Sequence, residues 1–276
     1  MLDAGVDGLI YMTPLHDGVA VVSEIAAGNN FHMQELCQNS RVLAREGSKR
    51  GIFLYAARGT RYAFCMRLSV GIDEAGRGCV IGPLVVACVA ADEADRKWFW
   101  AHNVRDSKIV PGPQRDKLAE MIKERCWFQL KIFHPTAIDE AVRDRSRTLN
   151  GLELEAMAEL LDDFLDEFPE REAVALVDAP SISAQHYLEK LYDRSQWSDM
   201  KRLKAKHEAD RKDRTVAAAS ILAKAERERL IAKLKKELGV DFGCGYSHDE
   251  VTREHLKTCE READYVRWSW KTTSVR

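Results

Sequence analysis

The apolar segment CVIGPLVVACVAAD, residues 79–92, constrains the fold more than any other part of the chain. It is rich in valine, and Gly82 and Pro83 interrupt it, so a strand is favoured and a helix is disfavoured. The segment LSVGID, residues 68–73, is a second strand candidate and ends in an acid. Two such segments, so close in sequence, predict a hairpin-like pair of strands.

Helical and strand patterns alternate along the rest of the chain. Apolar residues at helical spacing predict helices over residues 112–126, 148–168 and 213–238, the last rich in alanine where it should pack. Strands are predicted over residues 127–135, which alternate in polarity, and over residues 172–181, an apolar run that includes an acid. Strands interleaved with helices indicate an α/β fold.

The first 65 residues differ from the rest. Short apolar pieces are separated by Gly, Asn and Ser without a sustained helical period, which predicts a few strands or loose order. Two interpretations stay open: a small accessory module, or an extension, disordered or non-native, upstream of a natural start at Met66. No function follows from either.

The composition of the chain disfavours a membrane protein, a zinc-stabilised protein and a uniformly basic nucleic-acid-binding protein. The 276 residues contain no apolar stretch long enough to span a membrane and no basic start followed by an apolar block, so we expect a cytoplasmic protein without a membrane partner. The seven cysteines form no CxxC pair, which indicates free thiols in a reducing compartment and disfavours structural zinc. A formal net charge of -2 argues against a uniformly basic coat for nucleic acid.

Acids stand at the ends of predicted strands. Asp73 and Glu74 follow one strand, Asp178 ends another, and Asp210 comes just before the alanine-rich helix. Taken singly, each acid is explained as a solvated or capping residue. Converging carboxylates would repel one another unless cations neutralise them, and oxygen ligands suit Mg²⁺ or Mn²⁺. The pair Asp73-Glu74 therefore indicates a divalent metal site.

The glycines around Arg77 resemble a phosphate-binding loop only superficially. A dinucleotide fold requires a helix immediately after such a loop, whereas here an apolar run with Pro83 follows. Glycine on both sides of Arg77 would instead let a ligand approach the backbone, and the guanidinium offers a forked donor to phosphate. A plain tight turn is the alternative.

Seven short motifs occur together and in order: GIDEAGRG, VRDSK, VDAPS, HEAD, AAASILAK, GCGYSHD and RWSWKT. In this combination the chain resembles ribonuclease HII in its archaeal form, from about Leu68 to Thr272. The resemblance implies a ribonuclease H-like fold, a central mixed β-sheet flanked by helices with a C-terminal helical region. It divides the chain into the extension 1–65, a catalytic domain 66–225 and a helical substrate-binding region 226–276.

The resemblance also implies a four-carboxylate site that is both catalytic and metal-binding, here Asp73, Glu74, Asp178 and Asp210. Asp210, not Asp213, lies ten residues before the serine of the ASILAK motif and so matches the family's fourth acid. Similar enzymes hydrolyse the phosphodiester with two metal ions, one activating a water and the other stabilising the leaving oxygen. No covalent protein nucleophile is expected.

Residues outside the acids are implicated in substrate binding. In the family the Gly-Arg-Gly loop, here Gly76, Arg77 and Gly78, meets the ribose 2′-hydroxyl and a neighbouring phosphate, and the tyrosine corresponding to Tyr246 packs at the junction of ribonucleotide with deoxyribonucleotide. Lys108 and Asn150 are further candidates. The basic segment 201–214 would neutralise phosphates, although solvated helix faces look similar.

The implied function is an endoribonuclease, ribonuclease H of type HII. It would cut the RNA strand of RNA/DNA hybrids and incise 5′ of single ribonucleotides in duplex DNA, leaving 5′-phosphate and 3′-hydroxyl ends, as in replication and ribonucleotide excision repair. We expect a monomer whose partners are these nucleic acids. Cys79, Asp213 and the SHD that follows Tyr246 depart from the common pattern without removing a catalytic group.

Three alternatives remain open. A ribonuclease HIII type would cut hybrids but lacks the Gly-Arg-Gly sensor, a silent protein on the same fold would only bind nucleic acid, and a hydrolase of small phosphorylated metabolites would not need the long basic segment. His207 is expected to be a local hydrogen-bond partner, and the indoles of Trp98, Trp100, Trp268 and Trp270 are expected to pack rather than stack on bases.

Overall fold

The computed structural model describes residues 67–144, 148–180, 183–271 and 273, together with the backbone of two short strands near the N-terminus. The chain divides into two compact units, Met1–Met66 and Arg67–Arg276. In the first unit, β1 (Met12–Pro14) and β2 (Ala20–Val22) pair antiparallel. The other expectations for residues 1–65 lie outside the described residues.

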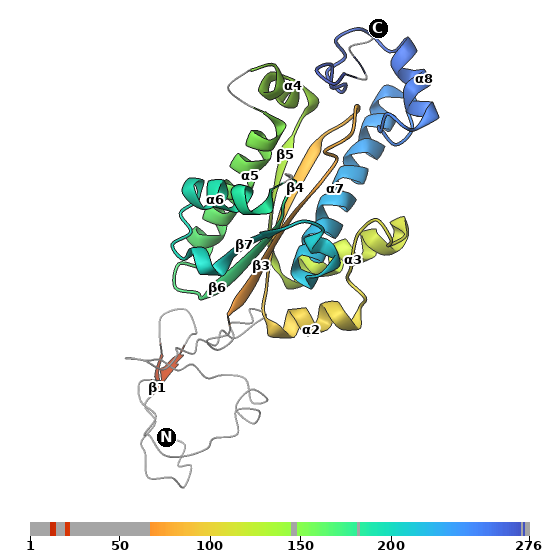
Figure 1. The fold of residues 1–276 in the computed structure, drawn as a ribbon. Helices are drawn as coiled ribbons and strands as arrows, with labels where there is room; N and C mark the ends of the chain where they lie inside the picture. The colour runs from red at the N-terminus through yellow and green to blue at the C-terminus, as the bar shows by residue number, and fades with distance from the viewer. Residues whose placement is uncertain are drawn as a thin grey trace, which may run out of the picture. The chain divides into compact units, whose positions relative to one another are not determined.

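Within the described part of the larger unit, a five-stranded mixed sheet forms the centre, in the order β5-β4-β3-β6-β7 (Figure 1). The expected hairpin pair, β3 and β4, is antiparallel, as are β4 and β5, while β3, β6 and β7 run parallel. The strands are β3 (Leu68–Ala75), β4 (Leu84–Ala91), β5 (Trp127–Phe133), β6 (Ala173–Asp178) and β7 (Leu203–Lys206).

Helices cover both faces of the sheet (Figure 1). One core layer joins the sheet to α4, α5 and α6, and the other joins it to α2, α3 and α7. Because both faces are covered, every residue of β4 is buried. The helices on the first face are α4 (Pro135–Arg143), α5 (Leu149–Glu167) and α6 (Ala184–Arg194), and those on the second are α2 (Glu93–Ala101), α3 (Gly112–Arg125) and α7 (Arg214–Leu238).

The apolar segment 79–92 is a strand only over Leu84–Ala91. Gly82 adopts φ +87°, a left-handed backbone that glycine adopts without strain, and Pro83 follows it, so the strand cannot extend further toward the N-terminus. Residues before Gly82 instead form isolated bridges with the C-terminal part of the chain, Cys79 with Tyr246 and Ile81 with Val266. The segment therefore ties the sheet to the C-terminal residues.

The helix predicted over residues 213–238 is confirmed as α7. The Asp213 side chain accepts hydrogen bonds from the backbone N–H groups of Thr215 and Val216, so this acid caps the helix. The start of α7 lies so close to β3 that a Cβ atom on Gly71 would be 2.4 Å from the Thr215 carbonyl carbon. The predicted domain boundary between residues 225 and 226 falls inside this continuous helix.

The C-terminal region adds α8 (Glu250–Thr258) and a smaller apolar cluster beyond the far end of α7. Val80 and Ile81 pack there against Ile231 of α7, Leu256 of α8 and Phe242, which lies between the two helices. Among the described helices, none combines the length and apolar character required to cross a bilayer.

Candidate active site

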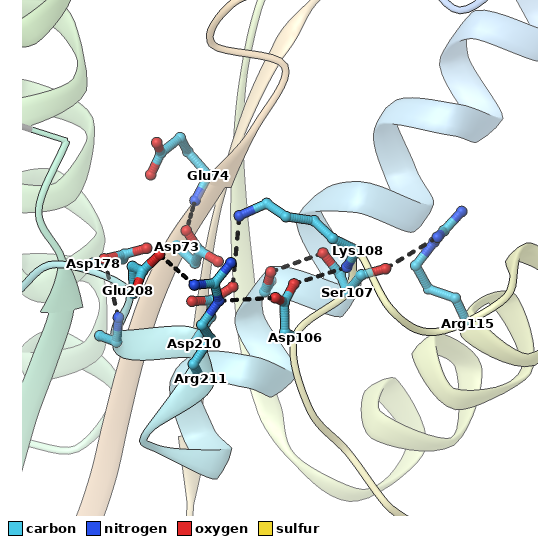
Figure 2. Close-up of polar contacts among 12 residues, drawn as sticks. Asp73, Glu74, Asp106, Ser107, Lys108, Arg115, Asp178, Glu208, Asp210 and Arg211 are labelled. Carbon is cyan, nitrogen blue, oxygen red and sulfur yellow. Dashed lines mark hydrogen bonds and ion pairs between the residues drawn. The ribbon is translucent and has the colours of Figure 1, made fainter.

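Parallel pairing brings two of the predicted acids together. Strands β3 and β6 are neighbours with Ile72 opposite Val177, so Asp73 and Asp178, the next residue of each, lie at the same edge of the sheet. Asp210 lies on the short 3-10 helix η2 (Ala209–Arg211), which follows β7. The backbone N–H of Ala209 donates to the Asp178 carboxylate at 3.2 Å and fixes η2 against β6. Figure 2 shows Asp73, Asp178 and Asp210 grouped at this edge.

The fourth acid, Glu74, occupies the other side of β3. Successive side chains of a strand point to opposite faces, and in Figure 2 the Glu74 side chain extends away from the other three. Its backbone N–H donates to the Asp73 carboxylate at 2.7 Å. The charges nearest its carboxyl are those of Glu153, Asp178 and Arg77. The structure thus places three predicted carboxyls as one group, with Glu74 adjoining it from the α5 face.

Burial raises the pKa of all four carboxyls, and repulsion from other acids adds to the shift for Asp73, Glu74 and Asp210. Burial is the main cause in each case, and it raises the pKa of Glu74 to about 8 with Glu153 and Asp178 adding to the effect. The pKa of Asp73 lies well above its usual range because burial is reinforced by Glu74 and Asp178, while a hydrogen bond with Ser220 opposes the shift. The site therefore needs positive charge to hold its acids ionised.

One lysine supplies part of that charge. The Lys108 ammonium lies 3.8 Å from a carboxylate oxygen of Asp210 and is largely exposed, so it remains accessible to a ligand. Partial burial lowers the pKa of Lys108, but Asp210 and Asp106 raise it further, and the net shift is upward. Lys108 was predicted as a substrate contact, and the structure places it at the acids.

The chemistry of the donor set fits a hard divalent cation. One buried oxygen of Glu74 and both oxygens of Asp210 lack a hydrogen-bond partner, and such atoms are costly unless something binds them. All donors are carboxylate oxygens, which suit Mg²⁺ or Mn²⁺. Within the described ranges, no three acidic, histidine or cysteine side chains already form an arrangement that would hold an ion. The carboxyls are thus close and unsatisfied but do not form a finished coordination shell.

A network that the sequence analysis did not identify holds the Lys108 loop. Asp106 accepts a hydrogen bond from the Lys108 backbone N–H at 2.9 Å and forms an ion pair with Arg211 at 3.2 Å. The Ser107 and Ser220 hydroxyls are 2.9 Å apart, and Ser220 also bonds Asp73. Figure 2 shows the contacts of Asp106 and Ser107. Both residues lie within the VRDSK motif, which was the signal in the sequence that could have identified them.

The Gly-Arg-Gly loop has one constrained glycine and one open glycine. Gly76 adopts φ +95°, and a Cβ atom there would lie 2.5 Å from the Pro83 carbonyl oxygen. Gly78 is exposed, and a Cβ atom on it would meet only the Tyr246 ring, at 3.9 Å. Tyr246 is held beside the loop by the Cys79 bridge and lies under the Arg227 guanidinium, 5.3 Å from the ring centre. Gly78 and Tyr246 therefore border an accessible backbone surface.

Arg77 is fixed by neighbours in α5 and in the segment that follows β6. Its guanidinium donates to the Pro180 carbonyl at 2.8 Å and to the Asn150 side-chain oxygen, and lies 3.5 Å from the Glu153 carboxylate. Asn150, predicted as a substrate contact, is thus a partner of Arg77 in this structure. The missed residue here is Glu153. Its signal was an acid at helical spacing with the apolar residues that α5 buries, Ala156, Met157, Leu160, Leu161 and Phe164.

The remaining predictions concern nearby residues. His207 forms a hydrogen bond through Nδ1 with the Ala179 carbonyl at 2.9 Å, as expected of a local partner. Trp100 is the exception among the indoles, since it is 66% exposed and Arg214 stacks over its ring at 3.9 Å. An indole covered by arginine is occupied by a cation–π contact rather than packed in the core.

Comparison with known proteins agrees with this architecture. The family model Ribonuclease HII matches residues 70–273. A ribonuclease HII from Archaeoglobus fulgidus is 41% identical over 210 residues, 75% of this chain and 95% of that protein, and one from Pyrobaculum neutrophilum is 37% identical over 206 residues, 74% and 96%. The solved PCNA:RNase HII complex from Archaeoglobus fulgidus has a similar fold, with a TM-score of 0.65 at 39% identity over 74% of this chain and 94% of that one.

A second group of solved structures is similar in fold alone. Bst-RNase HIII in complex with Mn²⁺ is 18% identical with a TM-score of 0.63, over 95% of this chain and 86% of that one. The five-stranded sheet with helices on both faces is accordingly a ribonuclease H-like fold. With a family model that matches most of its length and relatives of this identity, the chain belongs to the ribonuclease HII family and is a ribonuclease H of type HII.

Proposed function

We propose that this ribonuclease H incises DNA on the 5′ side of a single embedded ribonucleotide, besides cutting the RNA strand of hybrids, and leaves 5′-phosphate and 3′-hydroxyl ends. The observation that carries the proposal is the position of the Gly-Arg-Gly loop. Glu74 of the acidic group is followed after one residue by Gly76, and Gly78 is open beside Tyr246. A sugar next to the scissile phosphate can therefore approach both the loop backbone and an aromatic ring.

The four carboxyls are proposed to hold the metal and to be the catalytic acids. Asp73, Asp178 and Asp210 would bind from one side and Glu74 from the α5 side. Two Mg²⁺ or Mn²⁺ ions held by these residues would supply the chemistry of phosphodiester hydrolysis, namely an activated water and stabilisation of the charge on the leaving 3′-oxygen. The unsatisfied oxygens of Glu74 and Asp210 support this assignment.

Other side chains would bind and orient the substrate. The Lys108 ammonium, exposed beside Asp210, is placed to bind a phosphate oxygen near the acids. Arg77 presents a partly exposed guanidinium for a neighbouring phosphate. Tyr246 offers a flat face at the point where a ribose would be followed by a deoxyribose, and the 2′-hydroxyl is the group that distinguishes the two sugars.

The surface around the site favours a polymer over a small metabolite. Four lysines of the basic segment are exposed, two of them on the edge strand β7 next to Asp178: Lys201, Lys204, Lys206 and Lys212. A cavity of about 510 Å³ between α5 and α6 is lined by Lys190 and Arg194 but also by Glu155 and Asp193, so it adds no excess of positive charge. The exposed lysines beside the acids suit a substrate with a repeating phosphate backbone.

A monomer in the cytoplasm completes the proposal. No disulfide joins the cysteines of the described ranges, and Cys79, Cys88 and Cys126 are buried thiols, which suits a reducing compartment. In the absence of metal, the strongly acidic site would bind nucleic acid poorly, which disfavours a purely binding role on this fold.

The test is cleavage of a labelled DNA duplex that contains one ribonucleotide, alongside a long RNA/DNA hybrid, with Mg²⁺, Mn²⁺ or EDTA. The full chain, a chain beginning at Met66 and Asp73→Asn are compared, with Asp213→Asn as the matched control because that acid caps α7. We expect metal-dependent incision 5′ of the ribonucleotide that Asp73→Asn abolishes and Asp213→Asn retains. Cutting of the hybrid alone would indicate the type HIII specificity instead, and cutting of neither would indicate a binding protein.

A further inference from the structure

Glu153 is a completely buried acid that the chemistry proposed above does not use. It lies on the first turns of α5, its exposed fraction is 0%, and neither carboxylate oxygen has a hydrogen-bond partner. A buried carboxylate is strongly destabilising unless a cation compensates it. The cation in contact is Arg77, whose Nη1 atom lies 3.5 Å from a Glu153 oxygen. Since an apolar residue would suit this position better for stability, the acid calls for a functional explanation.

The nearby neutral donor does not satisfy Glu153. The Tyr187 hydroxyl, whose pKa is raised first by burial and then by the charge of Glu153, donates to the Met157 sulfur at 3.3 Å. Burial raises the pKa of Glu153 to about 7, and the cations that oppose this shift are Arg77 and then Arg267. Arg267 donates all of its described hydrogen bonds to backbone carbonyls. The charge of Glu153 is therefore directed mainly at Arg77.

The contacts of Arg77 fix both ends of the residue. Arg267 holds the Arg77 carbonyl oxygen at 3.0 Å, Pro180 and Asn150 each accept one guanidinium hydrogen bond, and Glu153 supplies the negative charge behind the guanidinium. The Arg77 side chain nevertheless remains 31% exposed. Both terminal nitrogens of the guanidinium are thus held by protein, while the side chain as a whole stays partly exposed.

We propose that Glu153 is a positioning residue for ribonucleotide recognition, which orients the Arg77 guanidinium through their ion pair while Asn150 fixes the second nitrogen. This inference rests on the proposed function, because it assigns Arg77 to the substrate. Without the charge of Glu153, the guanidinium would lose its anchor and be free to adopt other rotamers. Recognition of a single ribonucleotide depends on one sugar and its phosphate, so it should suffer more than cutting of a long hybrid.

The test compares Glu153→Gln, which keeps the size and removes the charge, with Glu159→Gln, a control on the same helix that breaks an exposed pair with Lys131. Values of kcat/KM are measured on the duplex with one ribonucleotide and on a long hybrid. We expect Glu153→Gln to lower the first by about tenfold and the second by no more than about threefold, the scale of loss caused by misplacing a binding group. Glu159→Gln should change neither.

A double-mutant cycle separates positioning of Arg77 from an effect on Glu74, whose carboxyl also senses Glu153. In an Arg77→Ala background, Glu153→Gln should change the single-ribonucleotide activity by less than twofold. An undiminished tenfold loss in that background, equal losses on the two substrates, or no loss at all would each overturn the inference. Glu153→Asp keeps the charge but lengthens the ion pair with Arg77, so it should show a selective loss that is smaller than that of Glu153→Gln.

Thermal stability and wild-type activity identify two other outcomes: a variant that fails to fold, and a failure of the proposed function itself. Thermal unfolding of Glu153→Gln should occur close to the wild-type temperature, because Arg77 keeps its hydrogen bonds to Pro180 and Asn150 and its side chain is partly exposed. If Glu153→Gln does not fold, the comparison of Glu153→Asp with wild type in both backgrounds decides: a selective loss that vanishes with Arg77→Ala supports the inference, and its absence refutes it. A wild-type chain that does not cut the single-ribonucleotide duplex would refute the proposed function itself.

Discussion

Replacing Glu74 by glutamine should stabilise the metal-free protein at alkaline pH while removing activity. The pKa of Glu74 rises in the folded state from 4.5 to about 8, mainly through burial and then through Glu153 and Asp178. A carboxyl with a raised folded pKa contributes its full stability below the unfolded value of 4.5 and loses it as pH rises through about 8. The ionised carboxylate is therefore a cost to folding near pH 8, and glutamine cannot ionise.

The magnitude follows from the size of the shift. At about 1.4 kcal/mol for each pH unit, the whole shift corresponds to about 5 kcal/mol as an upper bound. Glu74 shares its repulsion with neighbouring acids, and the glutamine amide would itself be a buried polar group without a partner, so we expect a net gain of about 1–2 kcal/mol at pH 8. Such a gain raises the midpoint of thermal unfolding by about 2–6 °C for a chain of this size.

The assay is thermal unfolding in EDTA at pH 5 and pH 8 for wild type, Glu74→Gln and the exposed control Glu159→Gln. The gain should be present at pH 8, much smaller at pH 5, and absent in the control. Added Mg²⁺ or Mn²⁺ should stabilise wild type more than Glu74→Gln at pH 8. A variant that is less stable than wild type at pH 8, or equally stabilised at both pH values, would refute the electrostatic reasoning.

Three further predictions concern the loop and the C-terminal region. Gly76→Ala, strained by its positive φ and a contact at 2.5 Å, should unfold in urea with a loss of about 1–3 kcal/mol, whereas Gly78→Ala should keep wild-type stability and lose single-ribonucleotide cleavage. Arg267→Met deprives the Gly82 and Arg77 carbonyls of their hydrogen-bond donor and should lower the free energy of unfolding by about 2–4 kcal/mol in the same urea assay. An unchanged free energy of unfolding would contradict the stabilising role of these hydrogen bonds. Hydrogen bonds from the backbone of Cys244 and from Thr252 lower the pKa of Asp249 to about 2, so its stabilisation is complete above about pH 4 and lost as pH falls through 2. Asp249→Asn should therefore be less stable than wild type at neutral pH, and acid titration followed by circular dichroism should show the difference vanish near pH 2.

The strand and helix pattern of the sequence predicted the α/β class and the long helix α7, because periodicity reports which side of an element is buried. The same pattern overestimated the length of the strand within residues 79–92, since only Leu84–Ala91 forms it. Gly82 and Pro83 were recognised there as helix breakers, but they also end the strand, and Cys79 and Ile81 before them pair with partners more than 160 residues away. Local sequence carries no information on such distant pairing.

The acids were predictable one by one as residues at strand ends, and their convergence follows from the parallel pairing of β3 with β6. The orientation of Glu74 and the contacts of Arg77 were not predictable. They depend on which helix covers which face, and Asn150 and Glu153 belong to a helix and lie 73 and 76 residues after Arg77. Asp106 and Ser107 were quoted within a motif, but their role as supports of Lys108 is visible only once the loop meets α7.

The attachment of the Gly-Arg-Gly loop to the C-terminal residues has a consequence for the protein during its synthesis. The acids are in place only when residue 210 has joined the sheet, and the loop is secured only when Arg267 reaches the Arg77 carbonyl. A chain still emerging from the ribosome therefore carries a complete set of acids before its Gly-Arg-Gly loop is secured. With the ribonucleotide-sensing role proposed for this loop, a chain that ends before Arg267 would be the less selective enzyme.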